Sequence, residues 1–104
     1  MKAYQRFKRC IGKGNLWLYV VSLLNKKGPL HGYAIIQELR KLGFNISTVY
    51  GYVLLKRMVT DGVLVEVEEG GKKLYAASPQ AQENFKKAIE ELQDLIKALT
   101  CGVA

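Results

Sequence analysis

The sequence predicts a mainly helical protein with one small β-hairpin. Over most of the chain, apolar residues recur at steps of three and four, which is the spacing of helices with one buried face. Between Gly62 and Ser78 the period changes to two on either side of the turn sequence EEGG, which is the pattern of two short strands. A chain of 104 residues is long enough for one modest core. We therefore expect a single structural unit.

Three helices are expected before the hairpin. The first covers residues 15–25, where apolar residues occupy nearly the whole circumference and Asn15 is the expected N-cap. The second covers residues 30–42, with its apolar positions on one side, and ends at a glycine. The third begins at Ser47, in the stretch STVYGYVLLKRMVTDG, and ends at Gly62. Two helices joined by a short glycine-containing turn form the helix-turn-helix pattern.

The hairpin and one further helix complete the chain. The stretch VLVEVE alternates as a first strand, and KKLYAAS returns as the second. Ser78 and Pro79 then combine an N-cap with a proline at the first position of a helix that is expected to run to about Thr100. Three helices, a hairpin and a further helix follow one another in the order of a winged helix-turn-helix fold with a C-terminal extension.

The basic charge of the chain is concentrated near its N-terminus. Residues 1–14 carry five basic residues and no acid, and residues 79–104 have a net charge of −1, within a total of +7. This excess favours a polyanionic partner, and double-stranded DNA fits the winged-helix order of elements. The N-terminal arm also contains Tyr4 and Phe7. We expect it either to follow the DNA backbone as an unstructured segment or to form a surface helix that packs these two rings on a dimer partner.

The final helix carries an apolar seam that the preceding elements do not require. Its members recur at steps of four and three: Phe85, Ile89, Leu92, Ile96 and Leu99. A second copy of the same helix is the simplest cover, and the alternative is that the seam folds back onto the first helix of its own chain. The expected division is residues 1–78 as a winged-helix DNA-binding domain with a basic arm, and residues 79–104 as a C-terminal dimerisation helix.

The stretch GPLHGYAIIQEL, residues 28–39, resembles the segment by which PadR-like transcriptional regulators are identified. The resemblance extends from residue 14 to about residue 85. It implies a sequence-specific regulator, most simply a homodimeric repressor on a pseudo-palindromic operator. The string Thr48-Val49-Tyr50 matches a family signature literally, but that match inserts two residues into a helix. In the gap-free register, which we prefer, Tyr52 matches the family tyrosine and Val53 replaces its proline.

The third helix is the expected DNA-reading element. Its core-facing positions are expected to be Tyr52, Leu55, Met58 and Val59. Its outer face is expected to enter the major groove and comprises Ser47, Thr48, Val49, Tyr50, Val53 and Lys56. Phosphate contacts are expected from Lys72 and Lys73 at the hairpin tip, where glutamates partly cancel the charge, and from Arg9 in the arm. The rival interpretation is a winged helix whose third-helix surface binds another polypeptide.

The side chains that could carry other chemistry are few. His31 is the only histidine, and we expect a structural role in which its ring bonds the helix start and Gly32 lies close to a neighbouring helix. Cys10 and Cys101 are expected to be free thiols. We expect no enzymatic activity, no metal and no cofactor, because the sequence has no phosphate-cradling motif, no metal-ligand set and no nucleophile with a base at hand.

Two further expectations concern partners and location. Some relatives of the PadR-like kind bind flat aromatic ligands at the dimer interface, so the resemblance implies a possible aromatic effector lined by Trp17 and Tyr19, although both are more often core residues. The longest apolar run, LWLYVV, is far shorter than the roughly 20 residues of a membrane span, so we expect a cytoplasmic protein with no membrane partner.

Overall fold

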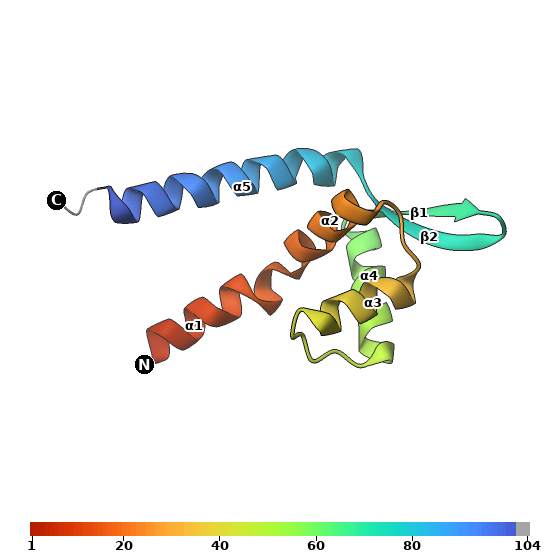
Figure 1. Ribbon diagram of the computed structural model, residues 1–104, viewed down its shortest axis with the longest axis horizontal. Coiled ribbons are helices and arrows are strands. Elements are labelled where there is room, and N and C mark those ends of the chain that lie inside the picture. Colours follow the sequence, from red (N-terminus) through yellow and green to blue (C-terminus); the bar gives the residue numbers. More distant parts are fainter. Residues whose placement is uncertain (102–104) are drawn as a thin grey trace.

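The computed structural model describes residues 1–101 and has the order of elements that the sequence predicts, with one more helix at the N-terminus (Figure 1). The elements are α1 (Lys2–Ile11), a short 3-10 helix η1 (Lys13–Asn15), α2 (Leu16–Lys27), α3 (Gly32–Lys41), α4 (Thr48–Thr60), β1 (Leu64–Glu69), β2 (Lys72–Ala77) and α5 (Pro79–Thr100). Because residues 2–11 form a helix, the expectation of an unstructured arm is wrong.

The core lies between α2, α3, α4 and the base of the hairpin. Its members are Leu16, Val20, Leu23, Leu24, Ile35, Ile36, Leu39, Ile46, Leu55, Leu64 and Tyr75. Five of the core and buried positions belong to α2, which confirms that this helix is central and mostly buried. Two serines fix the ends of the neighbouring helices as predicted: Ser47 Oγ accepts the Tyr50 N–H at the start of α4, and Ser78 Oγ accepts the Ala81 N–H at the start of α5. Asn15 stands at the N-cap of α2, but its side chain donates to the Cys10 carbonyl instead.

The hairpin is joined to the helices through the segment that precedes α3. Strands β1 and β2 pair antiparallel from Leu64 opposite Ala77 to Glu69 opposite Lys72. Leu30 and Tyr75 exchange two backbone hydrogen bonds, of 3.2 and 2.8 Å, so that one residue adds a minimal third strand beside β2. The wing is therefore anchored next to the start of α3.

The face that α4 turns toward the core agrees with the predicted one at three positions and differs at Tyr52. Tyr52 was expected to point inward but is 44% exposed, whereas Gly51 and Leu55 are buried. The reason is the close approach of α3: a Cβ atom on Gly51 would lie 2.6 Å from Ile36 Cγ1 and Cδ1. Leu55 is confirmed as core, and Met58 and Val59 pack partly buried against it. The absence of a side chain at Gly51 thus sets the contact between the two helices.

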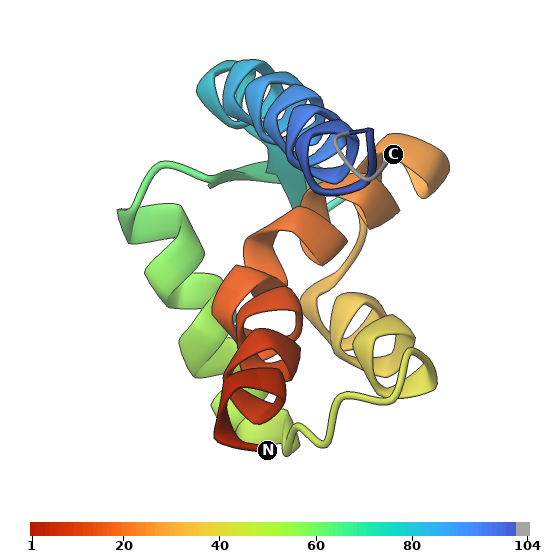
Figure 2. The ribbon, with the colours of Figure 1, turned by 90° about the vertical axis from the view of Figure 1, so that its left-hand side faces the viewer.

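Two helices project from this body. Figures 1 and 2 show α1 and the C-terminal part of α5 leaving the body on the same side, away from the hairpin, and the molecule measures 58 × 29 × 22 Å. No side chain of α1 is buried, and Ala81 is the only buried residue of α5. Phe85 and Ile89 are partly buried near the body, whereas the seam is exposed from Leu92 onward. The fold-back alternative therefore applies only to the first part of the seam.

Candidate nucleic-acid interface

The outer face of α4 presents an unusual mixture of exposed apolar and polar side chains. Val49 is 77% exposed, and Tyr50 and Val53 are each about two-fifths exposed at 42% and 41%. Ser47 and Lys56 are exposed on the same helix, while Thr48 is partly buried. Five of the six residues that the sequence predicted for this face are thus exposed, whereas Thr48 lies on the side of α4 that faces α3. Exposed apolar side chains such as these contribute nothing to the core of the chain, and their clustering on one helix face favours a binding surface.

A residue that the sequence did not single out organises the start of α4. The guanidinium of Arg40, at the end of α3, donates from Nη2 to Thr48 Oγ1 at 2.9 Å and from Nε to the Ile46 carbonyl at 2.8 Å. Arg40 is partly buried and crosses the turn between the two helices. Its role could not be predicted from spacing, because the contact joins residues on different helices through the shape of the turn.

The hairpin lysines are exposed but partly neutralised. Lys73 Nζ lies 3.1 Å from a Glu66 carboxylate oxygen on the opposite strand and 5.7 Å from the centroid of the Tyr75 ring. The hydrogen bond with Glu66 stabilises the ammonium and raises the pKa of Lys73 above its ordinary value. Lys72 stands opposite Glu69 in the strand register. The predicted partial cancellation of charge on the wing is therefore present.

Arg9 lies apart from the other predicted DNA contacts. It is exposed on α1, and in Figure 1 this helix and the hairpin lie toward opposite ends of the molecule. On the same helix the rings of Tyr4 and Phe7 stack with centroids 6.1 Å apart, and both are more than half exposed. Within one chain, the predicted DNA contacts thus fall on three separate surfaces: the outer face of α4, the hairpin tip and α1.

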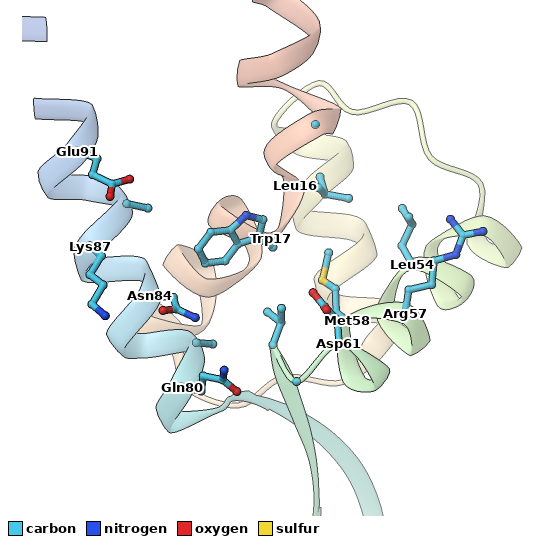
Figure 3. Close-up of a pocket in the computed structure, with 15 residues that line it drawn as sticks. Leu16, Trp17, Leu54, Arg57, Met58, Asp61, Gln80, Asn84, Lys87 and Glu91 are labelled. Carbon is cyan, nitrogen blue, oxygen red and sulfur yellow. The ribbon is translucent and has the colours of Figure 1, made fainter. Parts of the chain in front are cut away.

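A groove of about 800 Å³ separates α5 from the ends of α2 and α4 (Figure 3). Trp17 points into it from α2, Met58 lies on the α4 side, and Asn84 and Lys87 line the α5 side. Tyr19 does not line this groove. Its ring packs edge-on against Phe44, with centroids 5.0 Å apart, and its hydroxyl donates to the Ile11 carbonyl. Of the two aromatic residues predicted for an effector site, only Trp17 is therefore placed at a cavity.

The motif around His31 works differently from the prediction. His31 occupies the N-cap position of α3, but its ring is exposed and makes no capping hydrogen bond. The close approach is made by Gly32, as predicted, since a Cβ atom there would lie 2.7 Å from Tyr52 Cε1 and 3.2 Å from Tyr75 Cε2. The close packing at this motif thus depends on Gly32 and not on the His31 side chain.

Other chemistry finds little support in residues 1–101. Within this range, no group of three or more His, Cys, Asp and Glu side chains is arranged to hold a metal ion. Cys10 and Cys101 are free and exposed, as expected. None of the helices between residues 1 and 101 is long and apolar enough to cross a membrane.

A helix-turn-helix whose second helix is exposed beside a β-hairpin defines the winged-helix fold. The sequence profile of the transcriptional regulator PadR-like family matches residues 20–87, and the chain belongs to this family. The resemblance predicted from the sequence is therefore confirmed. No curated protein matches the chain.

Solved structures share the fold at low sequence identity. A transcriptional regulator from Clostridium thermocellum has 22% identity and a TM-score of 0.64, over 88% of this chain and 93% of that one. A PadR family transcriptional regulator from Eggerthella lenta DSM 2243 has 22% identity and a TM-score of 0.65, over 95% and 94%. SSV1 F-93 has 21% identity and a TM-score of 0.55, over 76% and 90%. The fold is confirmed by these similarities.

Proposed function

We propose that the protein is a homodimeric, sequence-specific DNA-binding regulator, most simply a repressor, that inserts α4 into the major groove at each half of a pseudo-palindromic operator. The observation that carries this proposal is the outer face of α4, where Val49, Tyr50 and Val53 are exposed next to Lys56. Apolar side chains at this place match thymine methyl groups, and hydroxyl groups match base edges. Lys56, the hairpin lysines and Arg9 would then contact phosphates, which position the protein without reading sequence.

The two projecting helices support the dimer. Along the seam of α5 the exposed fraction rises from 42% at Leu92 to 66% at Leu99, and α1 exposes Tyr4 and Phe7. A second copy can cover both faces, because in a two-fold dimer the same surface of each chain contacts the same surface of the other. The charges of the two helices are also complementary. All charged residues of α1 are basic, whereas the distal part of α5 has one basic residue, Lys97, and three acidic ones: Glu90, Glu91 and Asp94. A two-fold dimer would bind an operator whose two half-sites have related sequences in opposite orientation.

The test is to select bound duplexes from a random DNA pool with the purified protein. A two-fold motif should emerge, with half-site centres about 10 to 10.5 base pairs apart or a multiple of that distance. Affinity for the motif should fall steeply with salt. Tyr50→Ala should weaken the motif far more than random DNA, whereas Val65→Ala, which removes an exposed apolar side chain from β1, should change neither.

A different result would favour the rival function. If no motif emerges and affinity for duplex DNA is weak at all salt concentrations, the α4 surface is better explained as a site for another polypeptide. In that case Tyr50→Ala and Val53→Ala would have no effect on DNA binding.

The groove beside Trp17 supports a second, narrower proposal, that a small aromatic effector binds there and changes operator affinity. The groove places the Trp17 ring beside polar and charged side chains of α4 and α5, so it suits an aromatic ligand that also carries polar groups. Because Trp17 is the only tryptophan in the chain, its fluorescence reports binding directly. Titration with planar aromatic compounds should quench this fluorescence, and Met58→Glu, which places a charge in the groove, should prevent it.

A further inference from the structure

We infer that the start of α4 reads hydrogen-bond acceptors on base edges, and that Arg40 imposes this choice as a positioning residue acting through Thr48. The inference rests on the proposed function, since it specifies which bases α4 faces. It concerns two hydroxyl groups, those of Ser47 and Thr48, whose positions the sequence predicts but whose hydrogen-bonding direction only the structure defines.

The direction of each hydroxyl follows from its partner inside the protein. A serine or threonine hydroxyl donates one hydrogen and has two acceptor lone pairs. At Thr48 one lone pair is occupied by Arg40 Nη2 at 2.9 Å, and at Ser47 one is occupied by the Tyr50 N–H at 3.1 Å. Both oxygens therefore act as acceptors within the protein. Each hydroxyl keeps its own hydrogen and one lone pair for a group outside the protein, and the surrounding charge decides which of them is used.

Arg40 is well suited to fix this arrangement. Its guanidinium has five N–H donors in a rigid plane and no acceptor, so it can only donate to Thr48. The second bond, from Nε to the Ile46 carbonyl at 2.8 Å, holds the plane against the turn. A lysine at this position has a single ammonium and could not maintain both contacts in the same geometry. Arg40 thus fixes the position of the Thr48 hydroxyl and occupies one of its two lone pairs, which leaves its hydrogen free to donate.

The surrounding charge favours the same kind of partner. The N-terminus of α4 carries the positive end of the helix dipole, and the Arg40 charge lies beside it. The chain has no acidic residue between Glu38 and Asp61. A positive field attracts electronegative edges and disfavours donor groups. Purine N7, guanine O6 and thymine O4 are acceptors in the major groove, whereas cytosine presents its N4 amino donor there.

The inference gives a specific base preference. At the position of each half-site that faces Thr48, the protein should disfavour cytosine by roughly 5- to 150-fold against the best base, which is the range of one good base contact. This contrast distinguishes it from phosphate binding, which carries no sequence information.

The experiment starts from the operator that the random pool yields. Affinities are measured for all four base pairs at each half-site position with the native protein, Thr48→Val, Thr48→Ser and Arg40→Lys. Thr48→Val is nearly isosteric but has no hydroxyl, so it should abolish the discrimination against cytosine at one position and leave random-DNA affinity within about twofold. Arg40→Lys should reduce the same discrimination, and Thr48→Ser should retain it. Where the preferred base is a purine, its 7-deaza analogue should weaken binding of the native protein but not of Thr48→Val.

The outcomes separate the inference from the proposed function. If the pool yields no motif, the proposed function itself fails. If a motif exists but Thr48→Val changes no base preference, or weakens all sequences equally, Thr48 does not read bases and the inference is wrong. A preference for cytosine at the Thr48 position would overturn it as well. Thermal unfolding checks that each variant is folded, and should Arg40→Lys not fold, the Thr48 variants decide alone.

Discussion

The winged-helix body and the two projecting helices differ in how they bury their apolar side chains. In the body, Val20, Val21, Ile35 and Ile36 are completely buried, although the chain is short. In α1 no side chain is buried, and in α5 burial is complete only at Ala81. The body therefore has the core that a folded unit requires, while the projecting helices keep an apolar face for contacts outside the chain. The buried core and the exposed apolar faces thus lie in different segments of the chain.

The largest expected effect comes from the projecting part of α5. Replacing Leu92 and Ile96 together with glutamate should yield monomers, because each carboxylate would be buried among apolar side chains in the dimer at a cost of several kcal/mol. The body should remain folded, since neither residue contributes to its core. Sedimentation gives the mass, and circular dichroism gives the fold.

A matched variant places the same charges away from the seam. Gln93→Glu with Ala98→Glu adds two carboxylates on the same turns of α5, about 80° and about 140° from the centre of the apolar stripe at 100° per residue. This protein should remain dimeric. Equal masses for the two double variants would mean that the seam is not the interface, and the division between body and projecting helices would lose its functional meaning.

Within the body, the largest effect is expected where α3 and α4 approach most closely. Gly51→Ala normally stabilises a helix by up to about 1 kcal/mol, because alanine has the higher helix propensity. Here the added Cβ would lie 2.6 Å from two atoms of Ile36, which is fully buried and cannot move aside. We expect a net loss of roughly 1 to 3 kcal/mol in the free energy of unfolding, measured by denaturant titration.

A double-mutant cycle isolates this contact. In an Ile36→Ala background the space in front of Gly51 is free, so Gly51→Ala should cost little or even stabilise the protein. If Gly51→Ala is equally costly with and without the Ile36 side chain, the close approach is not the cause.

These positions show what the sequence could and could not predict. Helices, hairpin and caps follow from local rules, namely the period of the apolar residues and the preference of Ser47 and Ser78 for N-caps. One position on the core face of α4 was predicted wrongly, because a helical period of 3.6 allows either Gly51 or Tyr52 there and only the packing of α3 selects Gly51. Arg40 could not be found, since its contact with Thr48 depends on the path of the turn. The apolar seam of α5 is visible in the sequence, but what covers it is not.

A smaller effect, on the salt dependence of DNA affinity, should tell whether α1 contacts DNA as well as a second copy of the chain. Lys56→Ala, in the body, and Arg9→Ala, on a projecting helix, should each weaken binding to all sequences alike and reduce the slope of log affinity against log salt by about 1. Lys86→Ala, at an exposed position of α5 where no DNA contact is predicted, is the control and should leave the slope unchanged. A slope that responds to Lys56 but not to Arg9 would restrict DNA contact to the body.

The smallest effect is expected at His31. Here the comparison between exposed and buried positions is made within one motif, between exposed His31 and buried Gly32. His31 is exposed and makes no side-chain hydrogen bond at the start of α3, so His31→Asn should change the free energy of unfolding by no more than about 0.5 kcal/mol and leave operator affinity unchanged. Gly32→Ala, one residue further, pushes a methyl group against the rings of Tyr52 and Tyr75 and should cost at least about 1 kcal/mol. Both are measured by denaturant titration under the same conditions. If His31→Asn lowers the free energy of unfolding as much as Gly32→Ala does, the histidine side chain, and not only the close approach at Gly32, stabilises the start of α3 against the hairpin.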